Sequence, residues 1–462
     1  MDQRIQGMVK RSMGKGRIAN FFQKSDALYL LAFFMLLIGL GTALLLLPAA
    51  WAPGKAALGK LKPLDALFTA ASAVCVTGLS TVSIADFSRL GQIILICLVQ
   101  AGGLGIISVS SLLMAIPGYR IALWQRNVIR GFYVDGLEYQ PRRIARNIIA
   151  LTLGVEGLGM LLLAACFRSA GVEDWLFMGL FHSISAFCNA GFSPFAQGIA
   201  PYAGHAPIMA VLMALIVLGG LGFIVMQDLG MRLAGQKPCL SYHSRIVLAM
   251  TAGLILGGAA LFWLIERNRL FAAMTPGQSL LAALFQSVSP RTAGFEGVPQ
   301  AGLTELSKML TGILMLIGGA PGSIAGGIKV TTVFVIALAV TRQGDGCGDI
   351  KLLRHRITAS TINQGVVYFL KAVILFLICV AALFVTEGQG EGKTDAIIFE
   401  TISAFSTVGL SLNFTASLSA GGKLVIIAAM FAGRVGLIAL AFPAMRRRNY
   451  AVTYPEGSIL LG

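Results

Sequence analysis

Four short stretches of the chain combine glycine with small and hydroxyl-bearing residues, a composition suited to holding a dehydrated cation. They read F-T-A-A-S-A-V-C-V-T-G-L from Phe68, F-H-S-I-S-A-F-C-N-A-G-F from Phe181, F-Q-S-V-S-P-R-T-A-G-F from Phe285 and F-E-T-I-S-A-F-S-T-V-G-L from Phe399. Glycine lets a backbone adopt angles that other residues avoid and approach an axis closely. Backbone carbonyls from four such loops can replace the hydration shell of a cation.

The candidate ion ligands are the three residues that end on the glycine of each stretch. They are Val76, Thr77, Gly78, Asn189, Ala190, Gly191, Thr292, Ala293, Gly294, Thr407, Val408 and Gly409. The stretch before them, such as 64–74, is long enough for a half-helix of about two or three turns. The partly negative C-terminal end of this half-helix would point at the ion. We expect a cation at these residues and no metal elsewhere in the chain.

The segments that must position these loops are long and apolar. Hydrophobic residues make up 56% of the 462 residues, charged residues only 12%, and the mean hydropathy is +0.80. Soluble globular chains do not have this composition, so the sequence predicts a polytopic membrane protein. A membrane-spanning helix needs about 20 apolar residues, and the four glycine-bearing stretches are too short and too polar to span.

The distribution of Lys and Arg predicts the topology. The loops between units are rich in Lys and Arg, a bias that sets orientation and places these loops and both termini in the cytoplasm. Each unit then contributes two spans, eight in total, and its glycine-bearing stretch must enter and leave on the outer side. Lipid permits such a re-entrant loop only where protein encloses it or water lines it.

The predicted fold is therefore all-α, with four span–pore-loop–span repeats around one central pore. The expected divisions are a cytoplasmic N-terminal tail (1–25), repeat 1 (26–116), a cytoplasmic loop with repeat 2 (117–234), repeat 3 (235–341), a cytoplasmic loop with repeat 4 (342–449) and a C-terminal tail (450–462).

A second candidate site lies inside the third repeat, where 309–340 is too long for one span and too short for two. Its middle reads G-G-A-P-G-S-I-A-G-G-I-K over 318–329. Glycine and proline at this density do not hold a regular helix, and broken helices at membrane depth are a mark of transporter sites. We predict a gate just below the filter, formed by Gly318, Gly319, Ala320, Pro321, Gly322, Ser323, Gly326, Gly327 and Lys329 together with Arg434 of the last span.

Other polar residues carry weaker signals. His182 and Glu400 hold the second position of their stretches, where we expect them to face outward or to support the loop, and Arg291 is expected to brace its own loop. Glu156 in the third span has no role that the sequence assigns. No pair of carboxylates, Ser/His/Asp set or phosphate loop is present, so an enzyme is not expected. The net charge of +16 is read as membrane orientation and not as nucleic-acid binding.

The loops V-T-G-L, C-N-A-G-F, R-T-A-G-F and S-T-V-G-L, together with G-G-A-P-G-S-I-A-G-G-I-K, resemble the Trk/Ktr/HKT superfamily of potassium transporters. The resemblance covers nearly the whole chain. A single span before the first loop makes the chain more similar to the KtrB branch than to the TrkH branch. The chain departs from the family's gate pattern at Ala320 and Ile324, where Ser and Thr are usual, and this puts polar contacts in the closed gate in doubt.

The resemblance implies a homodimer in the cell membrane, plasma or inner, in which each protomer has its own pore. It also implies a cytoplasmic ring of KtrA-like regulatory subunits, which would carry the nucleotide and dock on the basic inner face. It matches Gly78, Gly191, Gly294 and Gly409 to the family's filter glycines, with Gly78 favouring potassium over sodium. The chain itself is expected to hold no cofactor, with sodium left open as an activator.

The sequence thus predicts potassium uptake through the four loops, controlled by the gate loop and the regulatory subunit. Two alternatives remain at this stage: a sodium-selective or sodium-coupled transporter of the same fold, and, more remotely, a membrane scaffold or sensor that transports nothing.

Overall fold

The computed structural model describes residues 26–52, 62–113, 141–342, 348–352, 355–388 and 393–436. The expected tails 1–25 and 450–462, and most of the basic loop that begins at 117, lie outside the described residues. Within the described residues the chain is helical apart from loops and one small β-hairpin, and the predicted all-α fold is confirmed.

The elements follow the chain in the predicted order of span, short helix and span. The first elements of the four units are α3 (Asp26–Leu45), α7 (Pro141–Ser169), α11 (Tyr242–Glu266) and α15 (Ala359–Glu387). The short helices before the glycine loops, called here the pore helices, are α4 (Pro63–Cys75), α8 (Trp175–Phe187), α12 (Pro276–Val288) and α16 (Thr394–Phe405). The inner helices that close the units are α5 (Arg89–Leu113), α9 (Ala206–Leu221) with α10 (Phe223–Leu233), α13 (Glu305–Leu316) with α14 (Val330–Thr341), and α17 (Ala420–Phe431), which continues into the π-helical turn η6 (Ala432–Gly436).

The remaining elements are short connections. Strands β1 (Ile350–Leu352) and β2 (His355–Ile357) form an antiparallel hairpin in which Lys351 pairs with Arg356. Five 3₁₀ turns lie in loops: η1 (Pro48–Ala50), η2 (Ile84–Asp86), η3 (Ala200–Tyr202), η4 (Gln300–Gly302) and η5 (Thr415–Ser417).

Three described helices are long and apolar enough to cross a membrane, by length and composition. They are 146–169 in α7, α11 and α15, and the bent pair α9–α10 counts as a fourth. The break between α13 and α14 leaves shorter helical pieces in the third inner helix, and the described part of the fourth inner helix ends at Gly436. The total of eight spans stays a prediction.

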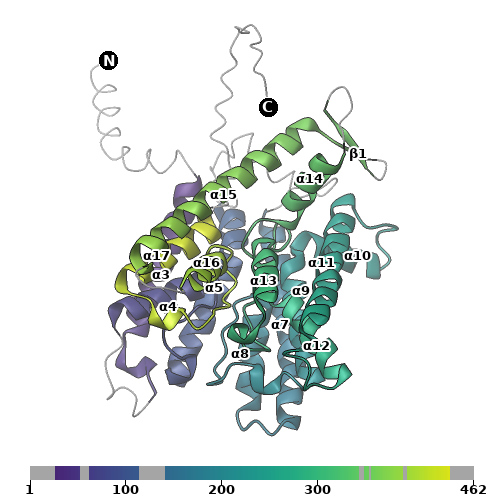
Figure 1. The fold of residues 1–462 in the computed structure, drawn as a ribbon. Helices are drawn as coiled ribbons and strands as arrows, with labels where there is room; N and C mark the ends of the chain where they lie inside the picture. The colour runs from purple at the N-terminus through teal and green to yellow at the C-terminus, as the bar shows by residue number, and fades with distance from the viewer. Residues whose placement is uncertain are drawn as a thin grey trace, which may run out of the picture.

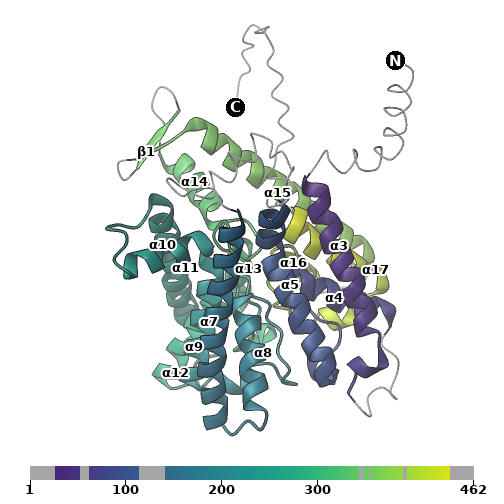
Figure 2. The same cartoon turned by 180° about the vertical axis from the view of Figure 1, so that it is seen from behind.

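The four units form a closed ring. Each pore helix packs between the two spans of its own unit, and it also contacts the inner helix of the preceding unit: α8 contacts α5, α12 contacts α9, α16 contacts α13 and α4 contacts α17. The last of these contacts joins the two ends of the chain. In Figures 1 and 2 the purple first unit and the yellow end of the fourth unit accordingly lie side by side, with the teal units on the other side.

Local sequence signals explain where the helices begin. Pro63 and Pro276 stand in the first turns of α4 and α12, where proline's missing N–H costs no hydrogen bond. Thr275 and Gln278 complete a capping box at the start of α12. Ser241 and Ser419 cap α11 and α17 by accepting backbone N–H groups of their first turns.

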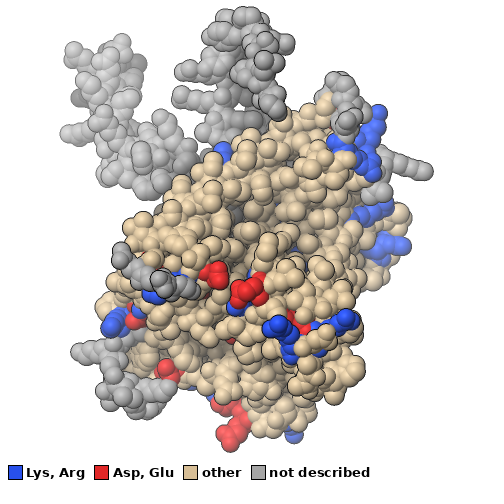
Figure 3. Space-filling view, viewed as in Figure 1, with Lys and Arg blue, Asp and Glu red and all other residues tan. Residues whose placement is uncertain are grey.

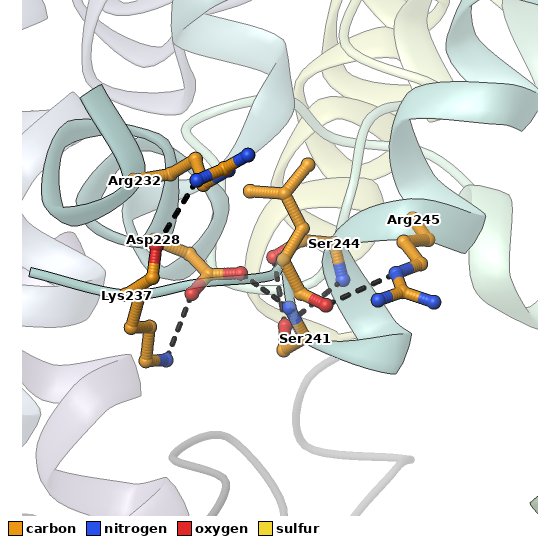
Figure 4. A network of polar contacts seen from close by, with 7 residues as sticks. Asp228, Arg232, Lys237, Ser241, Ser244 and Arg245 are labelled. Carbon is orange, nitrogen blue, oxygen red and sulfur yellow. Dashed lines mark hydrogen bonds and ion pairs between the residues drawn. The ribbon is translucent and has the colours of Figure 1, made fainter. Parts of the chain in front are cut away.

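The second inner helix differs from its sequence-based prediction. Two spans per unit predict one continuous span here, but the chain bends by 107° between α9 and α10. The bend falls at Gly222, whose φ of +85° is open to glycine and strained for other residues. After the bend, the buried Asp228 of α10 accepts hydrogen bonds from Lys237 Nζ and from the backbone N–H of Ser241, both at 2.8 Å. Figure 4 shows how these contacts hold the turn between α10 and α11.

The surface separates apolar and charged regions. On the face drawn in Figure 3, Lys and Arg gather near the β-hairpin and α10, charges of both signs lie toward the opposite end, and a broad band between them carries few charges. Long helices expose large apolar side chains such as Leu256 on α11 and Ile378 on α15. An exposed apolar belt of this kind is suited to contact with lipid.

Candidate functional site: a ring of four glycine loops against a glycine-rich loop

The four glycines of the repeated stretches meet at the centre of the ring. A Cβ atom placed on each would collide with the carbonyl oxygen of the residue preceding the glycine in the next loop. In chain order these oxygens belong to Ala190, Ala293, Val408 and Thr77. The order runs through all four loops and returns to the first, so the loops surround one axis. Only glycine fits at this close approach.

The backbone of each loop is strained at the same place. Of the five described non-glycine residues with positive φ, four lie two positions before a filter glycine: Val76 (57°), Asn189 (57°), Thr292 (69°) and Thr407 (53°). Three of them are β-branched, for which this conformation is a genuine outlier. Strain of this kind costs about 1–3 kcal/mol per residue, persists only where the surroundings enforce it, and clusters at functional sites.

The pore helices hold the loops through the serine in the middle of each stretch. The residue that directly precedes each glycine donates its backbone N–H to the backbone carbonyl of that serine. Examples are Thr77 to Ser72 at 2.8 Å and Ala190 to Ser185 at 2.7 Å. The hydroxyls of Ser72 and Ser403 accept from the glycine N–H groups at 3.1 and 3.0 Å. In the other two loops, the Ser185 and Ser289 hydroxyls donate to the carbonyls of Phe192 and Phe295. The sequence showed these serines but not this role.

The residues that precede the glycines donate their backbone N–H groups to the pore helices, so the loops have only their carbonyl groups left to bind another partner. Within the described residues, none of the carbonyl oxygens of the twelve filter residues accepts a hydrogen bond. Four of these oxygens lie at the glycine ring. A carbonyl with no partner is free to coordinate a cation.

The second positions of two stretches support the outer side of the loops. His182 Nε2 bonds the Ser193 hydroxyl at 2.9 Å, and Glu400 Oε2 accepts from the Ser411 hydroxyl at 2.8 Å. Both serines stand two residues after the filter glycine. The equivalent contacts fit the loop-supporting role expected for these two residues.

The glycine-rich loop 318–329 is an irregular segment between α13 and α14. Its neck is closed by Gly318 N–H to Ile328 O at 2.9 Å, Ile328 N–H to Leu316 O at 3.2 Å and Val330 N–H to Gly319 O at 3.1 Å. The side chain of Lys329 turns back to the carbonyl of Ala325 at 2.6 Å. The segment is therefore a defined hairpin-like loop.

This loop contacts the inner helices of all three other units. Ala320 N–H donates to Gly220 O of α9 at 2.9 Å. Arg434, 3% exposed in the π-helical turn after α17, donates from Nη1 to Ile324 O and from Nη2 to Gly102 O of α5, the latter at 3.1 Å. A Cβ on Gly326 would meet the hydroxyl of the filter residue Thr407. The loop thus lies directly against the filter, at the centre of the bundle.

The gate positions that depart from the family pattern make backbone contacts. Ala320 and Ile324 are buried. Ala320 uses its N–H and Ile324 its carbonyl in the bonds to Gly220 and Arg434. The hydroxyls absent at these positions are not required for these contacts.

The inner helices contain a second repeat, which was not among the sequence-based predictions. The inner helices carry a glycine pair at Gly102-Gly103, Gly219-Gly220 and Gly318-Gly319, and Gly433-Arg434 stands at the equivalent place. The first glycines at 102, 219 and 433 pack against the carbonyls of Val74, Phe187 and Phe405, each the seventh residue of its own unit's stretch. The recurring G-G-L-G, G-G-L-G, G-G-A-P-G and G-R-V-G signals were present in the sequence. They show that Arg434 stands where the other units have a glycine.

The fold and the site together define a polytopic, all-helical membrane protein whose four glycine-bearing loops surround one axis. The family model described as "TrkH: Cation transport protein" matches residues 30–447. The chain belongs to this family.

Individual relatives agree with this assignment. The chain is 35% identical to the Ktr system potassium uptake protein B of Vibrio alginolyticus, over 86% of this chain and 88% of the relative. It is 33% identical to the potassium/sodium uptake protein NtpJ of Enterococcus hirae, over 93% and 95%. The crystal structure of the potassium transporter TrkH from Vibrio parahaemolyticus has the same fold, with a TM-score of 0.72 at 19% identity over 92% of this chain and 86% of that one.

Proposed function

We propose that this protein takes up potassium ions across the cell membrane through the four glycine loops. The observation that carries the proposal is the closed glycine ring, in which each glycine lies against a carbonyl of the next loop. Membership of a cation transport family and similarity to proteins named for potassium uptake support it. Ion movement down the membrane potential supplies the driving force, about 2.3 kcal/mol per charge per 100 mV. No covalent step on a substrate is involved.

In this proposal the twelve filter residues act through their backbone. Rings of carbonyl oxygens replace the hydration shell of potassium. The serines at the ends of the pore helices hold the loops from behind, so the ring does not have to reorganise when an ion arrives. Cation binding is also favoured by the partly negative C-terminal ends of the four pore helices.

The loop 318–329 acts as the gate in the proposal. Its position against Thr407 and its bonds to Gly220 and Arg434 support a closed arrangement in which the loop occupies the ion path. Opening then requires the bonds of Arg434 to Ile324 and Gly102 to exchange for others. A loop rich in glycine allows the backbone change that such an exchange needs.

We further propose that two copies of the chain form a homodimer, each with its own pore, in the plasma or inner membrane. The ends of the inner helices, both termini and the β-hairpin face the cytoplasm, where a ring of KtrA-like nucleotide-binding subunits controls the gate. Exposed cations on α10, on the first turn of α11 and on the β-hairpin support this orientation and a docking surface (Figure 1): Arg232, Arg245, Lys351 and Arg356. Sodium is an activator in this scheme and not the main cargo.

The test is potassium and sodium flux into proteoliposomes of the purified protein, measured with and without the regulatory ring. Potassium flux that sodium does not match supports the proposal. Equal flux of both ions keeps the pore but removes the selectivity. Sodium flux above potassium flux favours the sodium-transporting alternative, which the name of the Enterococcus hirae relative makes worth testing. No flux of either ion with the ring present favours a scaffold or sensor.

A further inference from the structure

A group of polar side chains lies behind the second filter loop, away from the ion path. Glu156 of α7 is only 5% exposed. One of its carboxylate oxygens accepts a hydrogen bond from Gln100 Nε2 of α5 at 3.0 Å. The Cys188 thiol lies 3.7 Å from its other oxygen and 3.4 Å from Gln100 Oε1, so its single proton serves one of the two acceptors. We call these three residues the loop-2 brace.

The brace is attached to the filter. Cys188 directly precedes Asn189, the strained residue of the second loop with φ of +57°. The thiol also lies close to the gate, because a Cβ on Gly103 would contact both Cys188 Sγ at 3.1 Å and Ile324 Cγ2 at 3.3 Å. The brace therefore bonds to the end of the pore helix at the point where filter loop and gate loop approach one another.

Comparison with the third unit shows that the brace is not a requirement of the fold. The Ser183 hydroxyl donates to the carbonyl of Glu156 at 2.7 Å, and the Ser287 hydroxyl donates to that of Ile255 at 2.8 Å. Ser183 and Ser287 hold the third position of their stretches, so Ile255 is the counterpart of Glu156. The corresponding place in the third unit is thus apolar.

The other two positions also carry different residues in the third unit. Gln100 stands two residues before the glycine pair of its inner helix, where the later units have Val217, Leu316 and Phe431. Cys188 stands three residues before its filter glycine, where the third unit has Arg291. Val217, Ile255 and Arg291 line one small pocket, which shows that these three positions come together behind the third loop as well. Behind the second loop, a carboxylate, an amide and a thiol take these three positions instead.

Burying a carboxylate and an amide at membrane depth is expensive unless they are hydrogen-bonded. Packing alone does not explain Glu156, because its counterpart Ile255 fills the equivalent place in the third unit without a polar group. The hydrogen bond from the Ser183 hydroxyl to the backbone carbonyl of Glu156 already joins α8 to α7. This bond does not depend on the Glu156 side chain. What the side chain adds is a directed contact to the residue that enters the filter.

We propose that Glu156 is a positioning residue for ion selectivity: together with Gln100 and Cys188 it fixes the second filter loop at Asn189, so that its carbonyls keep the spacing that favours potassium over sodium. This inference rests on the proposed function. The brace acts through its hydrogen bonds, and its effect does not require a charge. A glutamine at 156 retains an oxygen to accept from one partner and an amide to donate to Gln100 Oε1.

The experiment measures potassium and sodium flux separately in proteoliposomes, for wild type, Glu156→Gln, Glu156→Leu, Gln100→Leu and the double leucine variant. Leu158→Ala, at an exposed position of the same helix, is the matched control. Loss of one buried hydrogen bond predicts that each single leucine variant lowers the potassium-to-sodium ratio about fivefold. The double variant should fall no further than either single one, because both remove the same brace. Glu156→Gln and Leu158→Ala should keep the wild-type ratio.

Wild-type protein without a preference for potassium would contradict the potassium selectivity of the proposed function itself. If wild type prefers potassium and Glu156→Leu keeps the wild-type ratio, the brace proposal alone is overturned. A Glu156→Gln ratio as low as that of Glu156→Leu also overturns it, because the carboxylate then acts by charge. Should the leucine variants fail to fold, Cys188→Ala tests the same brace, since removing the thiol contact must lower the ratio and an unchanged ratio rejects the proposal.

Discussion

Replacing Gly78 by serine is the most direct perturbation of the glycine ring. Gly78 has a φ of +99°, which L residues rarely adopt. The new Cβ would lie on the carbonyl oxygen of Ala190 and within 3.4 Å of the Gly409 Cα. Both neighbours are backbone atoms of other filter loops, so neither can rotate away as a side chain would. The substitution therefore acts on the ring itself.

The expected size follows from the backbone. A side chain held at such a φ costs about 1–3 kcal/mol. If displacing the Ala190 carbonyl relieves about 1.4 kcal/mol of this strain, the binding free energy of potassium becomes weaker by that amount relative to sodium. The potassium-to-sodium permeability ratio then falls about tenfold. Gly409 has the same conformation, with φ of +100°, and its Cβ would meet Thr77 O and the Gly78 Cα. Gly409→Ser should therefore lower the ratio by a similar factor.

The assay is the ratio of potassium to sodium flux into proteoliposomes, normalised to the amount of folded protein. Gly154→Ser is the matched control, because Gly154 lies on α7 without a positive φ, and a Cβ added there would have nothing within 4 Å. The reasoning is refuted if folded Gly78→Ser and Gly409→Ser keep the wild-type ratio, or if Gly154→Ser lowers it as much as they do.

Three further outcomes follow from the structure. Arg434→Gln should raise the flux measured without the regulatory ring by about thirtyfold. The reason is that a charged hydrogen bond worth about 2 kcal/mol is lost between Arg434 and the carbonyl of Ile324 or Gly102. Unchanged flux would show that Arg434 has no role in gating. Gly219→Ala puts a Cβ against the Phe187 carbonyl oxygen, and overpacking of this kind costs about 1–3 kcal/mol of stability, so the melting temperature should fall. Gly157→Ala, whose new Cβ lies in open space, should leave the melting temperature unchanged. Equal melting temperatures for the two variants would contradict this packing. Asp228→Asn weakens the hydrogen bonds from Lys237 and Ser241 and should cost about 1.5–3 kcal/mol of stability. The ratio of potassium to sodium flux should not change. A changed ratio at wild-type stability would show that the turn between α10 and α11 acts on the filter.

Much of the architecture could be read from the sequence because membranes restrict backbone structure severely. Apolar segments must be helices, and the charge bias sets their direction. Pore helices such as 63–75 were predicted from length and from the glycine that ends each stretch. The interruption of the third inner helix was predicted from its glycines and proline, since these residues do not sustain a helix.

Other features were missed because they depend on contacts between units. The bend at Gly222 ends a G-G-L-G sequence at 219–222, but the same four residues at 102–105 lie inside the continuous helix α5, so these glycines alone do not predict a bend. The positive φ of Gly222 matters because the gate loop packs against it, with the Pro321 carbonyl 2.8 Å from a Cβ placed there. The glycine pairs of the inner helices formed a visible repeat, but their meaning lay in the carbonyls they pack against.

By itself the sequence determined the class of protein, the four glycine-ended stretches and the break at 318–329. Composition and periodicity carry these properties, because each is a local response of the chain to lipid or to glycine. The tertiary structure alone decided which carbonyl each glycine faces, that Arg434 joins the gate loop to α5, and that Glu156 reaches Cys188. These pairings join residues far apart in the chain, and only the closed ring of four units brings them within bonding distance.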